Sequence, residues 1–435
     1  MNGKKVFLTL LLATLGIVGT EACTSVLVSG RFTKDGRPLL LKNRDTGNLL
    51  NHVLTVQGER YQYLAIVADG DTLPYAAWAG HNEAGFAIIN TAAYNLNGKP
   101  QQDSRNGDEA TLRSQQEGQR SRRPRRLNDG AIMRRALEIC ATLEDFEHFL
   151  DTLTNAEGDS NFGVVDAKGG AAYYEVGNRT DNDKSQLRYV KFDANDPRVA
   201  PYGYIVRTNH GYSGNREQDK GVERYLAISE YMQPRGFTQD YDARTFITQI
   251  PRTLRHGLTH LDVHDFAPED ETEAVFFPFR DFIPRYQTSC TVLVQGVREG
   301  EDPRLTVSWT IVGNPLTTVA VPLLLTPHGS LPELLGRHDG KGSLLNHWGL
   351  ELKKRLFPVT RGNGIDYINV AALLNKAGTG ILQRILPVEK GVLNRGDEVL
   401  AKLRTAGRLD VKEVDAYYKW VDEELRRQYH ELFGF

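Results

Sequence analysis

The chain has 435 residues, of which 40% are hydrophobic and 25% are charged, so it is long enough for one large hydrophobic core or for two domains. Its formal net charge of −2 and its isoelectric point of about 6.6 give no reason to expect nucleic acid or an acidic membrane surface as a partner. After the N-terminal segment, no hydrophobic run is long enough to span a bilayer, so we expect no transmembrane segment.

The first 22 residues have the three parts of an export signal. Lys4 and Lys5 precede an apolar run of 13 residues, Val6–Val18, and small residues stand at the third and first positions before Cys23. The run is shorter than the roughly 20 residues that a bilayer crossing needs. We therefore expect residues 1–22 to be removed, which gives an exported (periplasmic or secreted) protein that begins at Cys23.

An N-terminal cysteine would carry a thiol nucleophile and its own base, the free α-amine, on one residue. Because the amine titrates near about 7.7–8.0 and the thiol near about 8.5, proton exchange between them is nearly balanced at neutral pH. Two other interpretations of Cys23 stay open: a lipidated membrane anchor, or an ordinary small hydrophobe in a strand. Lipoprotein signals usually carry Leu three residues before the cysteine, where this chain has Thr20. Simple cleavage before Cys23 is therefore favoured over lipid attachment to it.

The other two cysteines do not point to a site. Cys140 lies in a helical pattern and Cys290 in a strand pattern, so both are most simply buried apolar residues. Whether they form a disulfide with each other stays open. The spacing of the three cysteines does not match that of a zinc site.

The elements expected along the chain form a layered α+β pattern. Strands are expected at 23–28, 38–42, 62–68, 84–92, 161–176, 187–192, 204–209, 289–297 and 305–312, and helices at 130–142, 143–153, from 222 and at 411–432. The polar stretch 101–126 is expected to be a solvated loop. We expect one domain over 23–330 and a mostly helical C-terminal extension over 331–435.

A series of short motifs lies between residues 23 and 230. They are Cys23-Thr24, Lys42-Asn43-Arg44-Asp45, Asn82-Glu83-Ala84-Gly85, Asn161-Phe162-Gly163, Thr208-Asn209 and Glu223-Arg224-Tyr225. Their order and spacing resemble the choloylglycine hydrolase and penicillin V acylase family of N-terminal nucleophile (Ntn) hydrolases. The strand pair near 290–322, with Gly313-Asn314-Pro315-Leu316, resembles the related acyl-coenzyme A:isopenicillin N acyltransferase family more.

The resemblance implies a four-layer αββα sandwich and a role for each matching residue. Cys23 would be the nucleophile, and Asp45 the carboxylate that holds its α-amine. Asn90 would be the oxyanion-hole side chain, Asn209 would support the oxyanion or the amine, and Arg224 would order the cluster. The resembling families need no metal or other cofactor.

Three further residues are candidates for supporting or substrate-binding roles. The family typically has Arg three positions before the aspartate, where this chain has Lys42. Because Arg is a planar fork and Lys a point charge, Arg44 could take that role instead. Asn82 is the third candidate. For each polar residue of the set, a turn or capping role at a strand end is the alternative interpretation.

His256, His260 and His264 recur every four residues, a spacing that metal sites use on helices. Gly257 and Asp262 argue against a regular helix here. We expect a polar loop near the pocket and no metal site.

The sequence thus predicts a hydrolase that cleaves linear, non-peptide amide C–N bonds of a small molecule through a thioester. The same site could instead serve an acyltransferase or a dipeptidase of related fold. A lipid-anchored surface binding protein without catalysis is the alternative from another class. The acyl and amine groups of the substrate, the oligomeric state and the role of 331–435 stay open, and a homo-oligomer remains possible.

Overall fold

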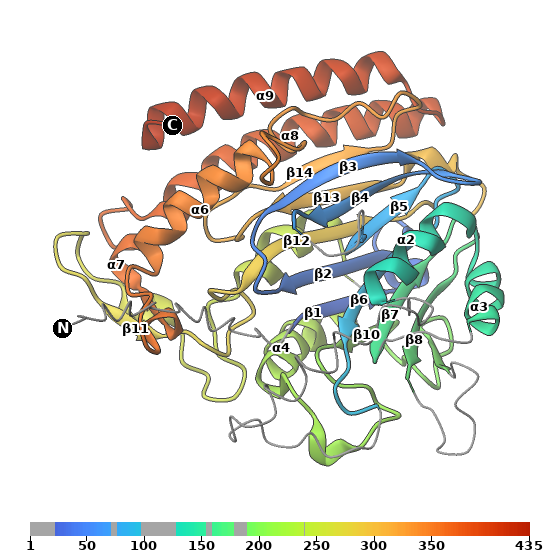
Figure 1. Ribbon diagram of the computed structural model, residues 1–435, viewed down its shortest axis with the longest axis horizontal. Helices are drawn as coiled ribbons and strands as arrows, with labels where there is room; N and C mark the ends of the chain where they lie inside the picture. The colour runs from blue at the N-terminus through green and yellow to red at the C-terminus, as the bar shows by residue number, and fades with distance from the viewer. Residues whose placement is uncertain (1–21, 71–75, 97–127, 154–158, 178–188, 239) are drawn as a thin grey trace, which may run out of the picture.

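Two antiparallel β-sheets form the centre of the molecule (Figure 1). The computed structural model describes residues 22–70, 76–96, 128–153, 159–177, 189–238 and 240–435. The six-stranded sheet has the order β10 (Tyr204–Arg207), β1 (Thr24–Val28), β2 (Leu39–Asp45), β12 (Thr288–Gln295), β13 (Val307–Val312) and β14 (Val321–Leu324). The seven-stranded sheet runs in chain order through β3 (Asn51–Gln57), β4 (Gln62–Ala68), β5 (Ala79–Asn82), β6 (Ala87–Ala92), β7 (Ser160–Val165), β8 (Ala171–Val176) and β9 (Tyr189–Asp193). The expected α+β class is confirmed.

The two sheets pack face to face. Strand β2 contacts β6 and β7 of the other sheet, and β1 contacts β8. Gly163 of β7 lies where the strands approach closely, because a Cβ atom there would stand 2.8 Å from Cδ1 of Leu40 in β2. A side chain at this position would therefore push the sheets apart. Apolar side chains of both sheets fill the space between them.

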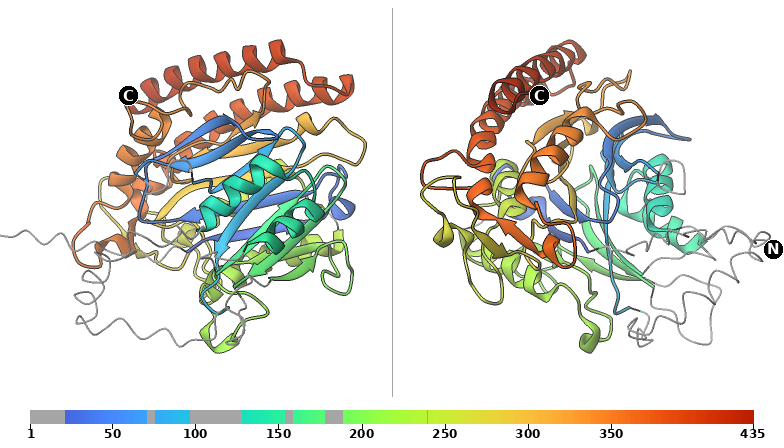
Figure 2. Two further views of the ribbon diagram at one scale, coloured as in Figure 1. Left: turned by 45° about the vertical axis from the view of Figure 1, so that its right-hand side comes forward. Right: turned by 60° about the vertical axis from the view of Figure 1, so that its left-hand side comes forward.

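Helices cover the outer faces of both sheets (Figure 2). Helix α2 (Asp129–Ile139) packs on β4, β5 and β6, and α3 (Leu143–Thr152) lies beside it over a second apolar cluster. On the six-stranded sheet, α4 (Val222–Thr238) contacts β10, and α5 (Ala243–Gln249) contacts β2 and β12.

The C-terminal segment packs onto the same core. Helices α6 (Leu344–Leu356) and α7 (Val370–Leu373) lead to a long pair, α8 (Ile381–Ala406) and α9 (Val411–Phe433), and α8 contacts β14. The small sheet of β11 (Phe276–Pro278) and β15 (Tyr367–Asn369) also joins this segment to the part of the chain before residue 331. A buried ion pair between Arg252 and Glu389, with an N–O distance of 2.6 Å, adds a further link.

Most expected elements lie within a few residues of their observed bounds. The expected strand at 161–176 is instead the hairpin of β7 and β8, because Asp166 accepts backbone hydrogen bonds that form a turn. The elements not predicted individually are strands β3, β5, β11, β14 and β15 and helices α5, α6, α7 and α8. Residues 1–21 and the expected loop 101–126 lie outside the described residues.

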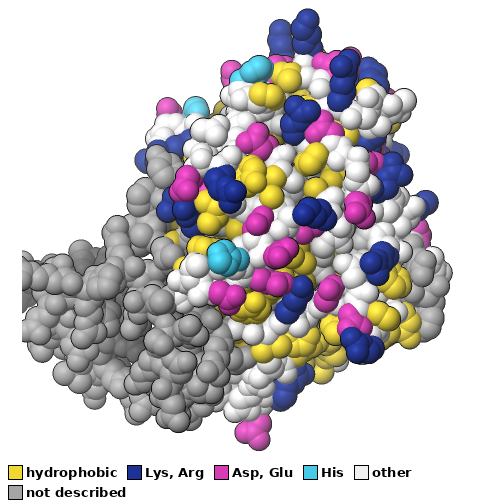
Figure 3. Space-filling view, turned by 90° about the vertical axis from the view of Figure 1, so that its right-hand side faces the viewer, with side chains coloured by type: hydrophobic (Ala, Val, Ile, Leu, Met, Phe, Trp, Pro, Cys, Tyr) yellow, Lys and Arg dark blue, Asp and Glu magenta, His cyan; other side chains and the backbone are white. Residues whose placement is uncertain are grey.

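The described surface carries mixed charge. Figure 3 shows Lys and Arg side chains interspersed with Asp and Glu over one face, with no patch of a single sign. Among the described residues, no helix is both long and apolar enough to cross a membrane.

His81 and Ser308 form a polar bridge between the two sheets. His81 of β5 is 1% exposed, and its Nδ1 lies 2.8 Å from Oγ of Ser308 in β13. Burial lowers the pKa of His81 to about 4, so the folded protein holds the neutral ring at neutral pH.

We predict that this histidine makes the protein sensitive to acid. Between about pH 6.5 and 4 the unfolded chain binds a proton that folded His81 excludes, so the free energy of unfolding falls as pH falls through this window, by on the order of 3 kcal/mol. His81→Gln should flatten that pH dependence in urea unfolding experiments, while His338→Gln, at an exposed position, should not. Equal pH slopes for His81→Gln and the unsubstituted protein would contradict the assignment.

Candidate active site

Cys23 directly precedes strand β1, the second strand of the six-stranded sheet. Thr24 pairs with Asn43 of β2, so continuing the register places Cys23 opposite Arg44. Directly opposite residues of neighbouring antiparallel strands point to the same side, so Cys23 and Arg44 share one face of the sheet. Cys23 is 4% exposed.

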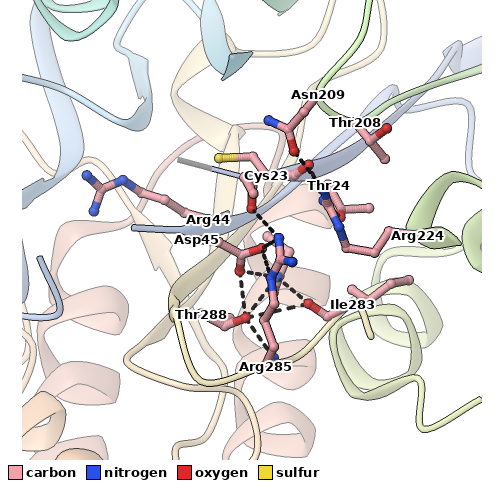
Figure 4. A network of polar contacts seen from close by, with 12 residues as sticks. Cys23, Thr24, Arg44, Asp45, Thr208, Asn209, Arg224, Ile283, Arg285 and Thr288 are labelled. Carbon is pink, nitrogen blue, oxygen red and sulfur yellow. Dashed lines mark hydrogen bonds and ion pairs between the residues drawn. The ribbon is translucent and has the colours of Figure 1, made fainter. Parts of the chain in front are cut away.

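Asp45 forms a buried ion pair with Arg285, in which two guanidinium nitrogens donate to one carboxylate oxygen (Figure 4). Oδ2 of Asp45 accepts hydrogen bonds from Nε and Nη2 of Arg285 at 2.9 and 2.7 Å. Oδ1 accepts from the Thr288 hydroxyl at 2.6 Å and from the Asn43 side-chain amide at 3.3 Å. With 1% exposure and four donors, the Asp45 carboxylate is held in one orientation.

The same pair holds the residue that precedes Cys23. Nη2 of Arg285 donates to the carbonyl oxygen of Ala22 at 3.1 Å, and the amide of Ala22 donates to the backbone oxygen of Asp45 at 3.3 Å. The peptide between residues 22 and 23 is thus located beside the Asp45 and Arg285 pair.

Arg224 of α4 joins the Cys23 backbone to Asn209. Its Nη1 donates to the carbonyl oxygen of Cys23 at 2.6 Å and to Oγ1 of Thr24 at 2.7 Å. Its Nη2 donates to Oδ1 of Asn209 at 2.7 Å. Burial, followed by the nearby charge of Arg285, lowers the pKa of Arg224 to about 10, so the guanidinium stays charged at neutral pH.

Asn209 lies directly after β10, in a loop that Asn161 fixes. The Asn209 side-chain amide donates to the carbonyl oxygen of Ala92 at 2.9 Å. The amide of Asn161, in β7, donates to the carbonyl oxygens on either side of Asn209, those of Thr208 at 3.4 Å and His210 at 3.2 Å. The seven-stranded sheet therefore sets the position of Asn209.

A buried ion pair supports the rest of this loop. Nε of Arg207 lies 2.9 Å from Oε1 of Glu175, and both side chains are fully buried. Glu175 also accepts from the backbone amides of Tyr212 and Ser213 at 2.7 and 2.8 Å. The Tyr212 ring centroid lies 3.7 Å from Cζ of Arg207. The pair thus ties β8 and β10 to the segment that follows Asn209.

Asn90 is on β6, in the sheet that faces Cys23. Its Nδ2 donates to Oδ2 of Asp129 at 2.9 Å, at the start of α2. Its Oδ1 accepts from Nζ of Lys42 at 2.5 Å, and Lys42 also donates to the carbonyl oxygen of Trp78 at 2.8 Å. Lys42 therefore fixes Asn90 to β2 across the space between the sheets.

Arg44 does not join the Asp45 cluster. Nη1 of Arg44 donates to Asn51 at 3.1 Å and to Ser289 at 3.4 Å, and its guanidinium lies 4.4 Å from the centroid of a Trp78 ring. Figure 4 shows its side chain extending away from Asp45.

The expectation that Asn82 supports the site is wrong. Its Nδ2 donates to the carbonyl oxygens of Leu137 and Cys140 at 2.9 and 2.8 Å, at the C-terminus of α2. Its Oδ1 accepts from the amides of Ala84 and Phe86 in the following turn. Asn82 therefore closes the β5 to β6 turn and caps a helix on the outer side of the seven-stranded sheet.

Sequence reasoning missed Arg285 and Thr288. Arg285 lies in the segment between β11 and β12, and Thr288 is the first residue of β12, about 240 positions after Asp45. The only available signal was that a strand expected at 289–297 would follow them, and that did not predict a contact with β2.

The three histidines lie in a turn and a short 3-10 helix. Nδ1 of His256 accepts from the amides of Leu258 and Thr259 at 3.3 and 3.1 Å, and Nδ1 of His264 lies 2.7 Å from Asp262. Within the part of the chain that the structure describes, no group of three or more His, Cys, Asp or Glu side chains could hold a metal ion.

Cys140 and Cys290 do not form a disulfide. Cys140 ends α2, and burial raises the pKa of its thiol to about 12. Burial also raises the pKa of the Cys290 thiol. Both thiols are therefore poor nucleophiles at neutral pH.

We predict that the Glu175 and Arg207 pair is essential for stability. Glu175→Leu leaves the Arg207 charge buried without its carboxylate, which should lower the free energy of unfolding by on the order of 3–5 kcal/mol. The double variant Glu175→Leu with Arg207→Leu should recover much of that loss, because no charge remains unpaired. Guanidinium unfolding measures the free energy of unfolding of the single and the double variant. A Glu175→Leu variant as stable as the unsubstituted protein would refute the prediction.

Comparison with known proteins supports the resemblance drawn from the motifs. Residues 31–241, just under half of the chain, match the acyl-coenzyme A:6-aminopenicillanic acid acyl-transferase family. None of the curated proteins compared with the chain matches it.

Similar solved structures include a bile acid hydrolase, a penicillin acylase and an ortholog of an acid amidase. A mutant of conjugated bile acid hydrolase from Clostridium perfringens is 11% identical, covers 70% of this chain and 92% of its own, and has a TM-score of 0.38. Penicillin V acylase from Agrobacterium tumefaciens is 13% identical over 70% and 86% of the two chains, with a TM-score of 0.36. The Caenorhabditis elegans ortholog of N-acylethanolamine-hydrolyzing acid amidase is 15% identical over 50% and 84%, with a TM-score of 0.30.

The family match lies over the same stretch as the ordered motifs from β2 to α4, and this stretch contributes Asp45, Asn90, Asn209 and Arg224. The resemblance to the N-terminal nucleophile hydrolase superfamily predicted from the motifs is confirmed by this family match.

Proposed function

We propose that the protein is an exported enzyme that cleaves linear, non-peptide amide C–N bonds of an acylated amine or amino acid. The main support for this proposal is the set of contacts to the Cys23 backbone. Arg224 donates to the Cys23 carbonyl oxygen, and Arg285, which is paired with Asp45, donates to the carbonyl oxygen of the preceding peptide. Removal of residues 1–22 would turn that peptide nitrogen into an α-amine beside Asp45. The proposed architecture is the four-layer αββα sandwich of the superfamily, extended by 331–435.

The proposed reaction has two halves. The Cys23 thiolate attacks the amide carbonyl carbon, and the oxyanion accepts hydrogen bonds from Asn90 and a backbone N–H. Collapse of this intermediate breaks the C–N bond, and the α-amine of Cys23 gives its proton to the leaving amine. Water then attacks the thioester, releases the carboxylic acid and restores the thiol.

The other site residues would act by positioning. Asp45 would hold the α-amine, and Arg285 and Thr288 would hold Asp45 through the hydrogen bonds at 2.6 to 2.9 Å. Arg224 would hold the Cys23 carbonyl and the Asn209 side chain in fixed positions relative to each other. In this arrangement Lys42 orients Asn90 from the opposite sheet, so it fills part of the place that Arg has in the family.

Acyl transfer is the second candidate, because the matching family is one of acyl-transferases. In that reaction an amine takes the acyl group from the thioester in place of water. Acyl groups on Cys23 of the exported protein would instead indicate the lipid-anchored binding protein.

The test is an amide screen on protein whose N-terminus is processed. We predict release of a carboxylic acid from at least one of the bile-acid, phenoxyacetyl, fatty-acyl and amino-acyl amides, and no release by Cys23→Ala. Asn90→Ala should lower the turnover rate by on the order of 100- to 1,000-fold, because one oxyanion donor is lost.

Two controls make the screen decisive. Cys140→Ala removes a buried thiol on the outer side of the seven-stranded sheet and should leave turnover unchanged. An added amine that captures the acyl group at the expense of the acid would assign the protein to acyl transfer. Turnover that survives Cys23→Ala would refute the proposed nucleophile.

A further inference from the structure

Asn314 lies in the loop between β13 and β14, within the motif Gly313-Asn314-Pro315-Leu316. It is 1% exposed. Its Nδ2 donates to the carbonyl oxygens of Arg285 at 2.8 Å and Thr288 at 3.2 Å. The side chains of these two residues hold Asp45. One buried amide from a distant loop therefore reaches both ends of the turn, 285–288, that supplies the partners of Asp45.

Other hydrogen bonds of this turn set its shape. The amide of Thr288 donates to the carbonyl oxygen of Arg285 at 3.0 Å, and the amide of Arg285 donates to Oγ1 of Thr288 at 3.0 Å. From outside the turn, the amide of Thr46 donates to the carbonyl oxygen of Gln287 at 2.9 Å. Asn314 adds two bonds from outside, one at each end, and so fixes the position of the turn as well as its shape.

Asn314 is itself held firmly in its loop. Its Oδ1 accepts from the amide of Leu316 at 3.0 Å, and its carbonyl oxygen accepts from the amides of Thr317 and Thr318 at 3.0 Å each. Gly313, directly before it, has a φ of +122°, a conformation that residues with a side chain rarely adopt. Because both polar atoms of the Asn314 side chain are bonded, its two donated hydrogen bonds keep one direction.

The C-terminal segment holds this loop through Arg252. Nε of Arg252 donates to the carbonyl oxygen of Pro315 at 2.8 Å. Its Nη2 donates to the carbonyl oxygen of Thr318 at 3.1 Å and to Oε2 of Glu389, in α8, at 2.6 Å. The same carboxylate oxygen accepts from the amide of Ala320 at 2.6 Å. Helix α8 therefore fixes both the loop and the chain at the start of β14.

We propose that Asn314 is a positioning residue for the reaction at Cys23. It holds the 285–288 turn so that the Arg285 guanidinium stays on Asp45, and it acts on Cys23 only through that pair. This inference rests on the proposed function, in which Asp45 holds the α-amine of Cys23. A cation beside Asp45 offsets its negative charge, so Arg285 weakens the attraction between Asp45 and the ammonium and favours the neutral amine.

Several charged or titratable groups lie on the elements around Cys23. They are Lys42, Arg44 and Asp45 of β2, Asp129 of α2, Arg207 of β10, Glu223 and Arg224 of α4, Arg285, and the Cys290 thiol of β12. Asn314→Leu changes none of these side chains and removes only the support of Arg285. If Arg285 moves away from Asp45, the amine and the thiol of Cys23 lie beside a less compensated negative charge, so both lose their protons at higher pH.

The experiment measures how fast iodoacetamide alkylates Cys23 between about pH 5 and 10, a range that brackets the thiol and the amine. It uses exported protein whose intact mass shows that it begins at Cys23, and mass spectrometry quantifies the N-terminal peptide. Asn314→Leu should raise the pH of the half-maximal rate by about 1 pH unit. Arg285→Gln should raise it similarly. The double variant should show no further rise, because Asn314 acts through Arg285.

Asn375→Leu is the matched control. Asn375 is 2% exposed, and its Nδ2 donates to the carbonyl oxygen of Ala371 at 3.0 Å and to Oγ1 of Thr379 at 2.9 Å. Because these bonds stay within one loop, this substitution should lower the free energy of unfolding without moving the alkylation midpoint.

An alkylation midpoint that is the same in Asn314→Leu and in the unsubstituted protein contradicts the positioning role, and so does a further rise in the double variant. If Asn314→Leu does not fold, Asn314→Ser takes its place in the same comparison, because the serine hydroxyl is too short to reach both carbonyl oxygens. Failure of the proposed function is seen separately, as an amide screen without turnover, and leaves the alkylation comparison valid.

Discussion

The buried ion pair of Asp45 and Arg285 is the interaction on which the candidate site depends. Two charges removed from water cost free energy unless they are paired and hydrogen bonded. Here Asp45 receives two hydrogen bonds from Arg285 and one from Thr288, and Arg285 also holds the Ala22 carbonyl. The pair therefore joins β2 to the segment before β12 and fixes the chain next to Cys23.

The rest of the structure holds the other groups in place around that pair. Arg224 connects the Cys23 carbonyl to Asn209, and Asn161 holds the backbone on both sides of Asn209. The C-terminal segment reaches the site through Tyr286, the neighbour of Arg285. Nζ of Lys353 in α6 lies 3.8 Å from the Tyr286 ring centroid. Residues 331–435 thus support the Arg285 segment.

The sequence predicted the parts of the site that lie in short local motifs. Cys23, Asp45, Asn209 and Arg224 each stand at or near the end of a strand or the start of a helix, and the structure brings them together. Asn90 lies on the facing strand, where Lys42 holds it. The α+β class followed from the alternation of strand and helix patterns.

The sequence could not predict what depends on long-range packing. Arg285 comes from an irregular segment and Thr288 from the first position of β12, about 240 positions after Asp45, where no periodicity indicates a partner. Asn82 was misassigned because a turn asparagine and a site asparagine look alike in sequence. Nothing in the motif around Asn314 indicates that its side chain reaches the turn that carries Arg285.

The central claim is that the exported protein begins at Cys23 and carries a reactive thiol there. Intact mass and N-terminal sequencing of protein recovered after export, before and after brief treatment with iodoacetamide, test it directly. The account predicts a chain that starts at unmodified Cys23 and gains one carbamidomethyl group there, since burial suppresses the Cys140 and Cys290 thiolates. A chain that still begins at Met1, or one with acyl groups on Cys23, would contradict it.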